Sequence, residues 1–320
     1  METTTTTTTS TTTTISTTTT ISTSTTLIKH IVLSGGGPSG LLTYGAIRHL
    51  AKEGFWQLKN IKSIYGCSIG SFIGVIISLG YDWSWLDDYF IKRPWHKVFS
   101  VNAFSFIEAF EKKGVFDKKM IEESLLPLLS AKDLNLEITL KELFAFNNID
   151  IHLYTTNINT FHFEKVDMSH KTHPDLKVME ALYRSMAYPF LFKPVCNDED
   201  CFIDGGLLNN YPLNDCIRQT QCNKDEIVAF KNIWVINDYK IGTKSTLFDF
   251  LIVLMKKMQR EIDTEVEQEE VKNIVKCVME NLDGPEAWFN ALSTEEMRTA
   301  FIEKGVAAAK TFLEHMVTSC

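Results

Sequence analysis

In the stretch His30–Gly40, HIVLSGGGPSG, a short apolar run is followed by three consecutive glycines and by a fourth glycine three positions later. This pattern predicts a buried strand, a tight turn and the start of a helix. The backbone N–H groups of such a turn point toward an anion. Two anions fit the spacing, namely the pyrophosphate of a dinucleotide and the oxyanion formed during acyl transfer.

The segments around this turn predict an α/β fold with a mostly parallel central sheet flanked by helices. Strands at 30–34 and 61–66 alternate with helices at 39–54 and 68–80, an order that favours parallel pairing. Residues 85–148 are expected to be mainly helical, and residues 177–187 to form a helix. Further strands are expected at 150–157, 160–166, 201–204 and 226–238. All segments beyond residue 244 are expected to be helical.

We divide the chain into three parts. Residues 1–26 are almost entirely Thr and Ser, so we expect a disordered tail with too little apolar surface to fold. Residues 27–240 form the α/β domain, and residues 241–320 form a helical C-terminal portion that packs on it or extends it. The tail lacks the features of a secretory signal, and no later segment reaches the roughly 18 apolar residues of a membrane span.

The composition of the chain disfavours several classes of binding partner. The formal net charge of −8 disfavours nucleic acid and purely electrostatic docking on anionic membranes. Seven cysteines without a CxxC pair favour reduced, cytoplasmic surroundings, and Cys196 and Cys201 are expected in a loop. The Cys and His residues show no metal-ligand spacing, so we expect neither a metal nor a cofactor.

The segment that follows the second strand decides between the two anions. A dinucleotide fold has an acidic residue about 20 positions after its glycines, and a Walker phosphate loop has a Lys directly after them. The chain has neither, and instead carries YGCSIGS at 65–71. Gly66-x-Ser68-x-Gly70 between an apolar strand and an apolar helix is typical of a nucleophile elbow. We expect the side chain of Cys67 to point away from the tip of this turn, so Ser68 is the candidate nucleophile.

Two residues are candidates for the base that activates Ser68. His315 is the only histidine after residue 173, whereas His162, His170 and His173 lie in a polar turn region. Asp204 ends a short apolar run in FIDGGLLNNYP (202–212), where Gly205 and Gly206 leave its carboxylate accessible. An aspartate within hydrogen-bond reach of a serine hydroxyl can act as its base. We therefore favour Asp204, although Asp-Gly-Gly by itself also fits a plain turn.

GGGxxG, GxSxG and DGG in this order resemble the patatin-like phospholipase family, as do RSMAYPFLFKPV (184–195) and TTNINTFHFEKV (155–166). The resemblance covers residues 28–215 and implies a three-layer α/β/α catalytic domain. It also implies a lipid acyl hydrolase of phospholipase A type that cleaves carboxylic esters of membrane lipids. The implied site comprises the Ser68–Asp204 dyad, the oxyanion loop Gly35, Gly36 and Gly37 with the N–H of Ile69, and the motif glycines Gly40, Gly66, Gly70, Gly205 and Gly206.

Within the implied oxyanion loop, Gly36 and Gly37 are the expected donors, because Pro38 has no N–H. Ser39 departs from the family, which usually has Arg or Lys there, so the lipid headgroup preference stays open. Lys193 and Arg184 are candidates to supply the missing positive charge.

The remaining alternatives concern lipid access and activity. YDWSWLDDYFIKRPW (81–95) and FSFIEAF (104–110) fit either helical core or an interfacial flap that contacts membranes transiently. A catalytically weak relative that binds lipids or proteins is the second reading of the chain, and a nucleotide-binding protein is the third. The resemblance also leaves a requirement for a protein activator open.

Overall fold

The computed structural model describes residues 26–99, 109–235, 240–265, 269–280 and 292–318. The Thr/Ser-rich tail predicted for residues 1–26 therefore lies, apart from Thr26, outside the described residues. The same holds for residues 104–108 of the aromatic segment FSFIEAF.

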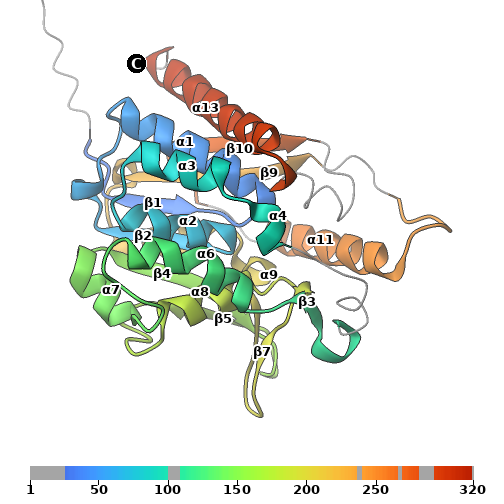
Figure 1. Cartoon of the computed structure of the whole chain (residues 1–320). Coiled ribbons are helices and arrows are strands. Elements are labelled where there is room, and N and C mark those ends of the chain that lie inside the picture. Colours follow the sequence, from blue (N-terminus) through green and yellow to red (C-terminus); the bar gives the residue numbers. More distant parts are fainter. Residues whose placement is uncertain (1–25, 100–108, 236–239, 266–268, 281–291, 319–320) are drawn as a thin grey trace, which may run out of the picture.

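The described residues form a central sheet of eight strands (Figure 1). Its strands are β1 His30–Leu33, β2 Ser63–Cys67, β4 Asp150–Asn157, β5 Glu164–Met168, β7 Val195–Cys196, β8 Cys201–Asp204, β9 Ile227–Val235 and β10 Ile274–Glu280. They are ordered β10-β9-β1-β2-β4-β8-β7, and β5 pairs with β4 outside this order. The strands from β10 to β4 are parallel, whereas β5 and β8 run antiparallel to β4. The mostly parallel sheet is confirmed.

Helices connect these strands and cover the sheet. They are α1 Gly40–Lys52, α2 Ile69–Ser78, α3 Trp83–Lys92, α4 Trp95–Val98, α6 Lys119–Ser130, α7 Leu140–Asn147, α8 Val178–Met186, α9 Gly206–Asn209, α10 Leu213–Thr220, α11 Leu247–Glu265 and α13 Glu295–Thr318, with 3-10 turns at Gly37–Ser39, Leu58–Asn60 and Lys224–Glu226. The described residues of the region 85–148 are mainly helical, as predicted, except for β3 Gly114–Phe116. This strand pairs with β6 Phe190–Phe192 in a separate small sheet.

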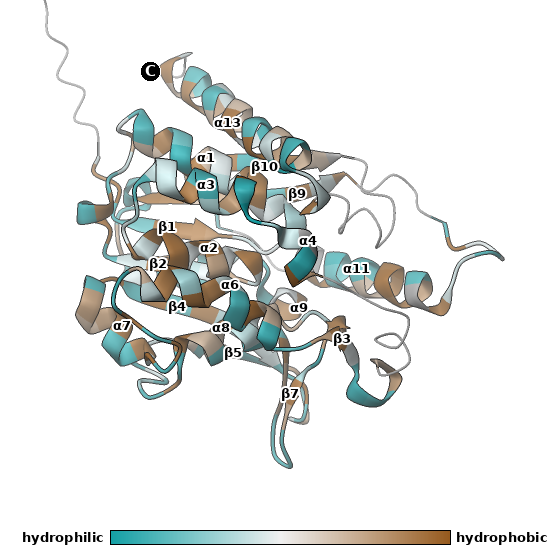
Figure 2. Ribbon diagram, in the orientation of Figure 1, coloured by the Kyte–Doolittle hydropathy of each residue, from teal (hydrophilic) through white to brown (hydrophobic). Residues whose placement is uncertain are grey.

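The two faces of the sheet contribute to two separate apolar cores. Ile31 and Leu33 of β1 belong to the larger core, which includes side chains of α1, α2, α6, α8 and α13. Val32, between them, belongs to a smaller core that is closed by Leu213 and Cys216 of α10. Successive side chains of a strand point to opposite faces, so β1 is buried on both sides. Figure 2 shows α2, which packs on β2, largely in the brown of hydrophobic residues.

The C-terminal portion is only partly as predicted. Helices α11 and α13 agree with the expected helical character, but residues 274–280 form strand β10, which pairs with β9 along the edge of the main sheet. The prediction of helix for this segment is therefore wrong. Val275, Cys277 and Met279 are buried, whereas Lys276 and Val278 are exposed, which is the two-residue period of a strand.

The two cysteines expected in a loop lie on paired strands instead. Cys196 of β7 is opposite Cys201 of β8, and a disulfide joins them. The placement in a loop is therefore corrected to a short hairpin.

Helices α1 and α13 cross in close backbone contact, side by side in Figure 1. A Cβ atom on Gly45 would lie 2.0 Å from the carbonyl oxygen of Ile302, and one on Gly305 would lie 1.9 Å from that of Leu42. These distances leave no room for a side chain at either crossing position. The two glycines therefore let α13 pack on α1.

We predict that Gly305→Ala lowers the melting temperature. Alanine favours a helix over glycine by about 1 kcal/mol, but here its methyl group meets a backbone carbonyl that cannot rotate away. Overpacking of this kind costs about 1–3 kcal/mol. Differential scanning calorimetry should therefore show a loss of several degrees. Gly242→Ala, at a position with open space around it, is the matched control. An unchanged or higher melting temperature for Gly305→Ala would contradict the tight crossing.

Candidate active site

Ser68 lies in a sharp turn between β2 and α2. Its backbone has φ 53° and ψ −126°, a conformation that residues with a side chain rarely adopt. A Cβ on Gly66 would lie 2.8 Å from the backbone nitrogen of Ser71, and one on Gly70 would lie 2.4 Å from the carbonyl oxygen of Leu33. The turn is therefore possible only with glycine at both flanking positions. This is the geometry expected of the elbow.

The register of three strands brings Ser68 next to Asp204. Cys67 pairs with Tyr154 on β4, so Ser68 follows at the level of Thr155, and Thr155 pairs with Asp204 on β8. The Ser68 hydroxyl donates a hydrogen bond of 2.6 Å to Oδ2 of Asp204. Two residues 136 positions apart in sequence thus meet at the same edge of the sheet.

The Asp204 carboxylate is buried, with a residue exposure of 3%. Its Oδ1 accepts a hydrogen bond of 2.7 Å from the N–H of Gly206 and contacts the Cys67 thiol at 3.9 Å. Burial raises the pKa of Asp204 to about 6, while the hydrogen bonds from Ser68 and Gly206 act in the opposite direction. A Cβ on Gly205 would lie 2.2 Å from the carbonyl oxygen of Tyr154, so this turn too depends on glycine.

Ser185, near the end of α8, ties the two turns together. Its hydroxyl accepts from the N–H of Ser68 at 3.1 Å and donates to the carbonyl of Tyr154 at 2.7 Å. Its own carbonyl accepts from the N–H of Gly205 at 3.4 Å. The segment RSMA carries part of the family resemblance, but the sequence does not predict this role of Ser185. Contacts across three elements leave no signal in sequence spacing.

The glycine loop lies beside the elbow, after the neighbouring strand β1. Gly36 has φ 153° and Gly37 has φ 55°, both favourable to glycine. The N–H groups of Gly36, Gly37 and Ile69 have no hydrogen-bond acceptor among the described residues. The N–H of Gly35, in contrast, donates to the carbonyl of Asn210 at 2.9 Å. Gly35 of the predicted oxyanion loop therefore anchors the loop through this bond, and the N–H groups of Gly36 and Gly37 remain the predicted donors.

Asn232 of β9 holds the glycine loop from the other side. Its amide Nδ2 donates to the carbonyls of Ser34 at 3.3 Å and Gly35 at 3.2 Å, and its Oδ1 accepts from the Thr43 hydroxyl at 3.0 Å. In a trans peptide the C=O and the next N–H point in opposite directions. Binding the Gly35 carbonyl thus turns the N–H of Gly36 away from Asn232. Sequence analysis missed Asn232 because it lies nearly 200 residues from the loop.

Ser39 is fully buried, and its hydroxyl donates to the carbonyl of Gly36 at 2.9 Å. It closes the glycine loop rather than facing solvent. Neither candidate for the missing cation is unpaired: Lys193 pairs with Asp117 at 3.3 Å, and Arg184 forms an ion pair with Glu180.

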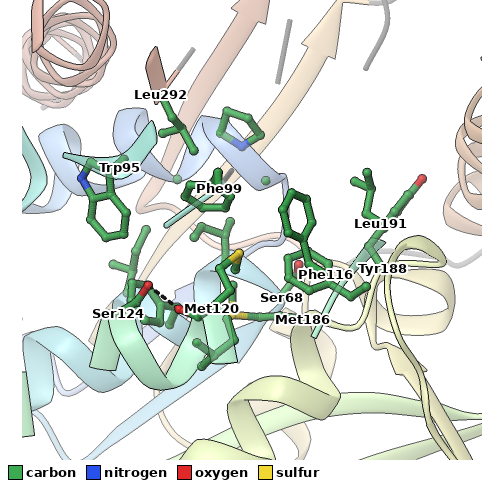
Figure 3. Close-up of a pocket in the computed structure, with 18 of the residues that line it drawn as sticks. Ser68, Trp95, Phe99, Phe116, Met120, Ser124, Met186, Tyr188, Leu191 and Leu292 are labelled. Carbon is green, nitrogen blue, oxygen red and sulfur yellow. Dashed lines mark hydrogen bonds between the residues drawn. The ribbon is translucent and has the colours of Figure 1, made fainter. Parts of the chain in front are cut away.

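An apolar cavity opens at Ser68 (Figure 3). Figure 3 shows Ser68 near Phe116 and Met186, with Trp95 and Phe99 on the opposite wall. None of its described lining residues carries a carboxylate, imidazole or thiol, so these residues offer a metal no usual ligand. The described lining residues are Gly37, Pro38, Gly40, Leu41, Ser68, Ile69, Phe72, Ile73, Phe90, Trp95, Phe99, Phe116, Met120, Ile121, Ser124, Met186, Tyr188, Leu191, Phe192 and Leu292.

The aromatic segment 81–95 belongs mostly to the core. Leu86, Tyr89 and Phe90 of α3 are buried, and Trp95 is buried against the cavity, while Trp85 is 39% exposed. The reading as helical core fits these residues better than a surface flap.

Residues 31–217 match the family described as patatin-like phospholipase. The chain belongs to this family. Membership places it among lipid hydrolases. It is 26% identical over 241 residues to the uncharacterized protein R571 of Acanthamoeba polyphaga mimivirus, covering 73% of this chain and 76% of the relative. It is 26% identical over 212 residues to the probable lipid hydrolase 463L of Invertebrate iridescent virus 6, covering 65% and 68%.

The patatin-like fold is also found in a solved structure. VipD from Legionella pneumophila superposes with a TM-score of 0.50 at 17% identity, covering 90% of this chain and 67% of VipD. At this identity the likeness shows the fold alone. Among the described residues, no helix combines the length and apolar composition that a membrane span requires.

We predict that Asn232→Ala lowers kcat for ester hydrolysis by roughly tenfold or more, because the N–H of Gly36 loses its fixed direction. KM should change little, since the apolar cavity is untouched. Steady-state kinetics with thermal unfolding in parallel would measure both effects. Thr43→Val, which removes only the hydroxyl bonded to Asn232 Oδ1, should show a smaller loss. A folded Asn232→Ala protein with normal kcat would contradict this role.

Proposed function

We propose that this patatin-like protein is a lipid acyl hydrolase of phospholipase A type, which cleaves carboxylic esters of membrane lipids through a Ser68–Asp204 dyad. The observation that carries the proposal is the 2.6 Å hydrogen bond from the Ser68 hydroxyl to a buried carboxylate. The three unpaired N–H groups beside it support an oxyanion hole. The apolar lining of the cavity that begins at Ser68 supports a substrate with an apolar acyl chain.

In the first half of the reaction, Asp204 takes the proton of Ser68 as the serine oxygen attacks the ester carbonyl. The negative charge that develops on the carbonyl oxygen is stabilised by the N–H groups of Gly36, Gly37 and Ile69. One such donor typically contributes about 2.7–4 kcal/mol. Asp204 then returns the proton to the departing alcohol, which leaves the acyl group on Ser68.

In the second half, water attacks the acyl-enzyme and Asp204 accepts its proton. The fatty acid leaves when Ser68 regains a proton from Asp204. The pKa of Asp204, raised to about 6 by burial, makes this carboxylate a stronger base than an ordinary aspartate while it stays ionised at neutral pH. The proposed steps thus use one carboxylate as base and acid in turn.

We predict that Ser68→Ala and Asp204→Asn each lower ester hydrolysis by roughly 1,000-fold or more, and that the double variant is little worse, because the two groups act as one unit. Release of fatty acid from phosphatidylcholine vesicles and hydrolysis of a short p-nitrophenyl ester would measure the loss. Labelling of Ser68 by a fluorophosphonate would report the nucleophile separately.

His315→Ala is the control, because His315 is the alternative base and should be dispensable. If Asp204→Asn kept more than about a tenth of the activity while His315→Ala lost it, the dyad would be wrong. Wild-type protein that neither hydrolyses esters nor reacts with fluorophosphonate would favour the second reading, a catalytically weak lipid-binding relative.

We predict that kcat/KM rises with pH through a single ionisation near pH 6 and then stays level into the neutral range. Asp204 must be ionised to accept the proton, so the protein is inactive below the raised pKa and active above it. A pH profile measured with the short ester would show this limb. The His315→Ala profile should coincide with that of the wild type. A midpoint near the ordinary aspartate pKa, about 3.9, would show that Asp204 is not the titrating base.

A further inference from the structure

We propose that His30, Cys222 and Glu226 form a zinc-binding site at the edge of the sheet opposite to Ser68. One ligand atom from each side chain lies within 4.8 Å of the other two. His30 begins β1, Glu226 directly precedes β9, and Cys222 lies in the turn after α10. The site goes beyond the proposed hydrolysis and does not depend on it.

The chemistry of the three donors selects zinc among common metals. Zinc is bound by imidazole nitrogen, thiolate sulfur and carboxylate oxygen, whereas calcium and magnesium take oxygen ligands only. Three protein ligands leave one tetrahedral position for water. The three residues also line an open cavity of about 630 Å³, which provides a path for the ion and room for that water.

Two of the donors already have partners of the kind that orient metal ligands. Nδ1 of His30 lies 2.7 Å from the Ser63 hydroxyl, which leaves Nε2 for a metal. The Cys222 sulfur lies 3.1 Å from the Thr220 hydroxyl, whose single proton also has the Cys216 carbonyl as an acceptor at 2.6 Å. Such outer hydrogen bonds hold a ligand in the correct orientation.

Closure around an ion needs only a small adjustment. Zinc bonds of about 2.0–2.3 Å in a tetrahedral arrangement place ligand atoms roughly 3.3–3.8 Å apart. The three ligand atoms, which lie within 4.8 Å of one another, must therefore approach by at most about 1.5 Å, a shift that rotation of the half-buried Cys222 and Glu226 side chains would supply. His30 is buried between β2 and β9 and supplies the rigid ligand.

Lysines around the site oppose an added cation. Lys29 forms an ion pair with Glu226, and both Lys29 and Lys62 line the same cavity as His30. A carboxylate has two oxygens, so Glu226 can contact Lys29 through one and the metal through the other. A thiolate and a carboxylate together balance the two charges of zinc. Lys29 therefore weakens the site without abolishing it.

The site is structural rather than catalytic. The glycine loop follows the C-terminal end of β1, whereas His30 is its first residue, and four strand residues span roughly 13 Å. A metal here would tie the starts of β1 and β9 to the turn after α10. Zinc that binds the folded chain but not the unfolded chain would stabilise the folded state by mass action.

The experiment uses the full chain stripped of metal with a chelator. Calorimetric titration with ZnCl₂ should give one equivalent bound, and the melting temperature should rise with zinc concentration. Titration with CoCl₂ should produce a near-ultraviolet thiolate-to-cobalt charge-transfer band. Zinc should also protect Cys222 of the wild-type chain from alkylation, a measurement that needs no variant.

Cys222→Ser should abolish the charge-transfer band, and His30→Gln should weaken zinc binding at least tenfold. Lys29→Met should tighten it, because a positive charge is removed. Cys277→Ala, which removes a buried thiol on β10, is the matched control and should keep the band. Hydrolysis of the short ester should be the same with and without zinc. Absence of a zinc-dependent rise in melting temperature, or a band that survives in Cys222→Ser, would overturn the proposal.

Discussion

The hydrogen bond between Ser68 and Asp204 depends on one register across three strands. β2 and β4 must align so that the residue after Cys67 is level with Thr155, and β8 must pair with β4 so that Asp204 is opposite Thr155. A shift of one residue in either pairing would turn the side chains to the other face of the sheet. The glycines at positions 66, 70 and 205 matter because backbone atoms approach within 2.2–2.8 Å of where their Cβ atoms would be. Because these positions carry no side chain, the turns pack closely enough for this register to bring Ser68 and Asp204 into contact.

Burial of the Asp204 carboxylate has both a stability cost and a chemical consequence. A carboxylate removed from water is destabilised, which is why its pKa rises to about 6, and hydrogen bonds from Ser68 and Gly206 offset only part of this. Since the folded pKa is above the unfolded one, this group favours folding at low pH and loses that contribution as pH rises through 6. The ionised form at neutral pH is therefore the less stable form of this group, and it is the form that can accept a proton.

Hydrogen bonds from neighbouring residues fix the backbone of the glycine loop and therefore the direction of its N–H groups. The N–H of Gly35 and the carbonyls of Ser34 and Gly35 all have partners, from Asn210 and Asn232. Buried backbone groups are rarely left unpaired, so three N–H groups beside Ser68 that have no acceptor among the described residues are unusual. Ser39 contributes to the same loop through the carbonyl of Gly36. Ser39 is thus a buried part of this loop rather than a group that faces solvent.

The sequence by itself determined the elbow, the Asp-Gly-Gly turn and most of the main-sheet strands up to residue 235, but not the short elements β3, β6, β7, α9 and α10. These features follow from local rules: apolar periodicity, and glycine where no Cβ fits. The tertiary structure alone decided which distant groups meet. It separated Gly35 from the other loop glycines through a contact with Asn210, and it made residues 274–280 an edge strand because one face of that segment is buried. It also brought His30 near Cys222 and Glu226, because adjacent parallel strands place their starts at one edge of the sheet, whatever their separation along the chain.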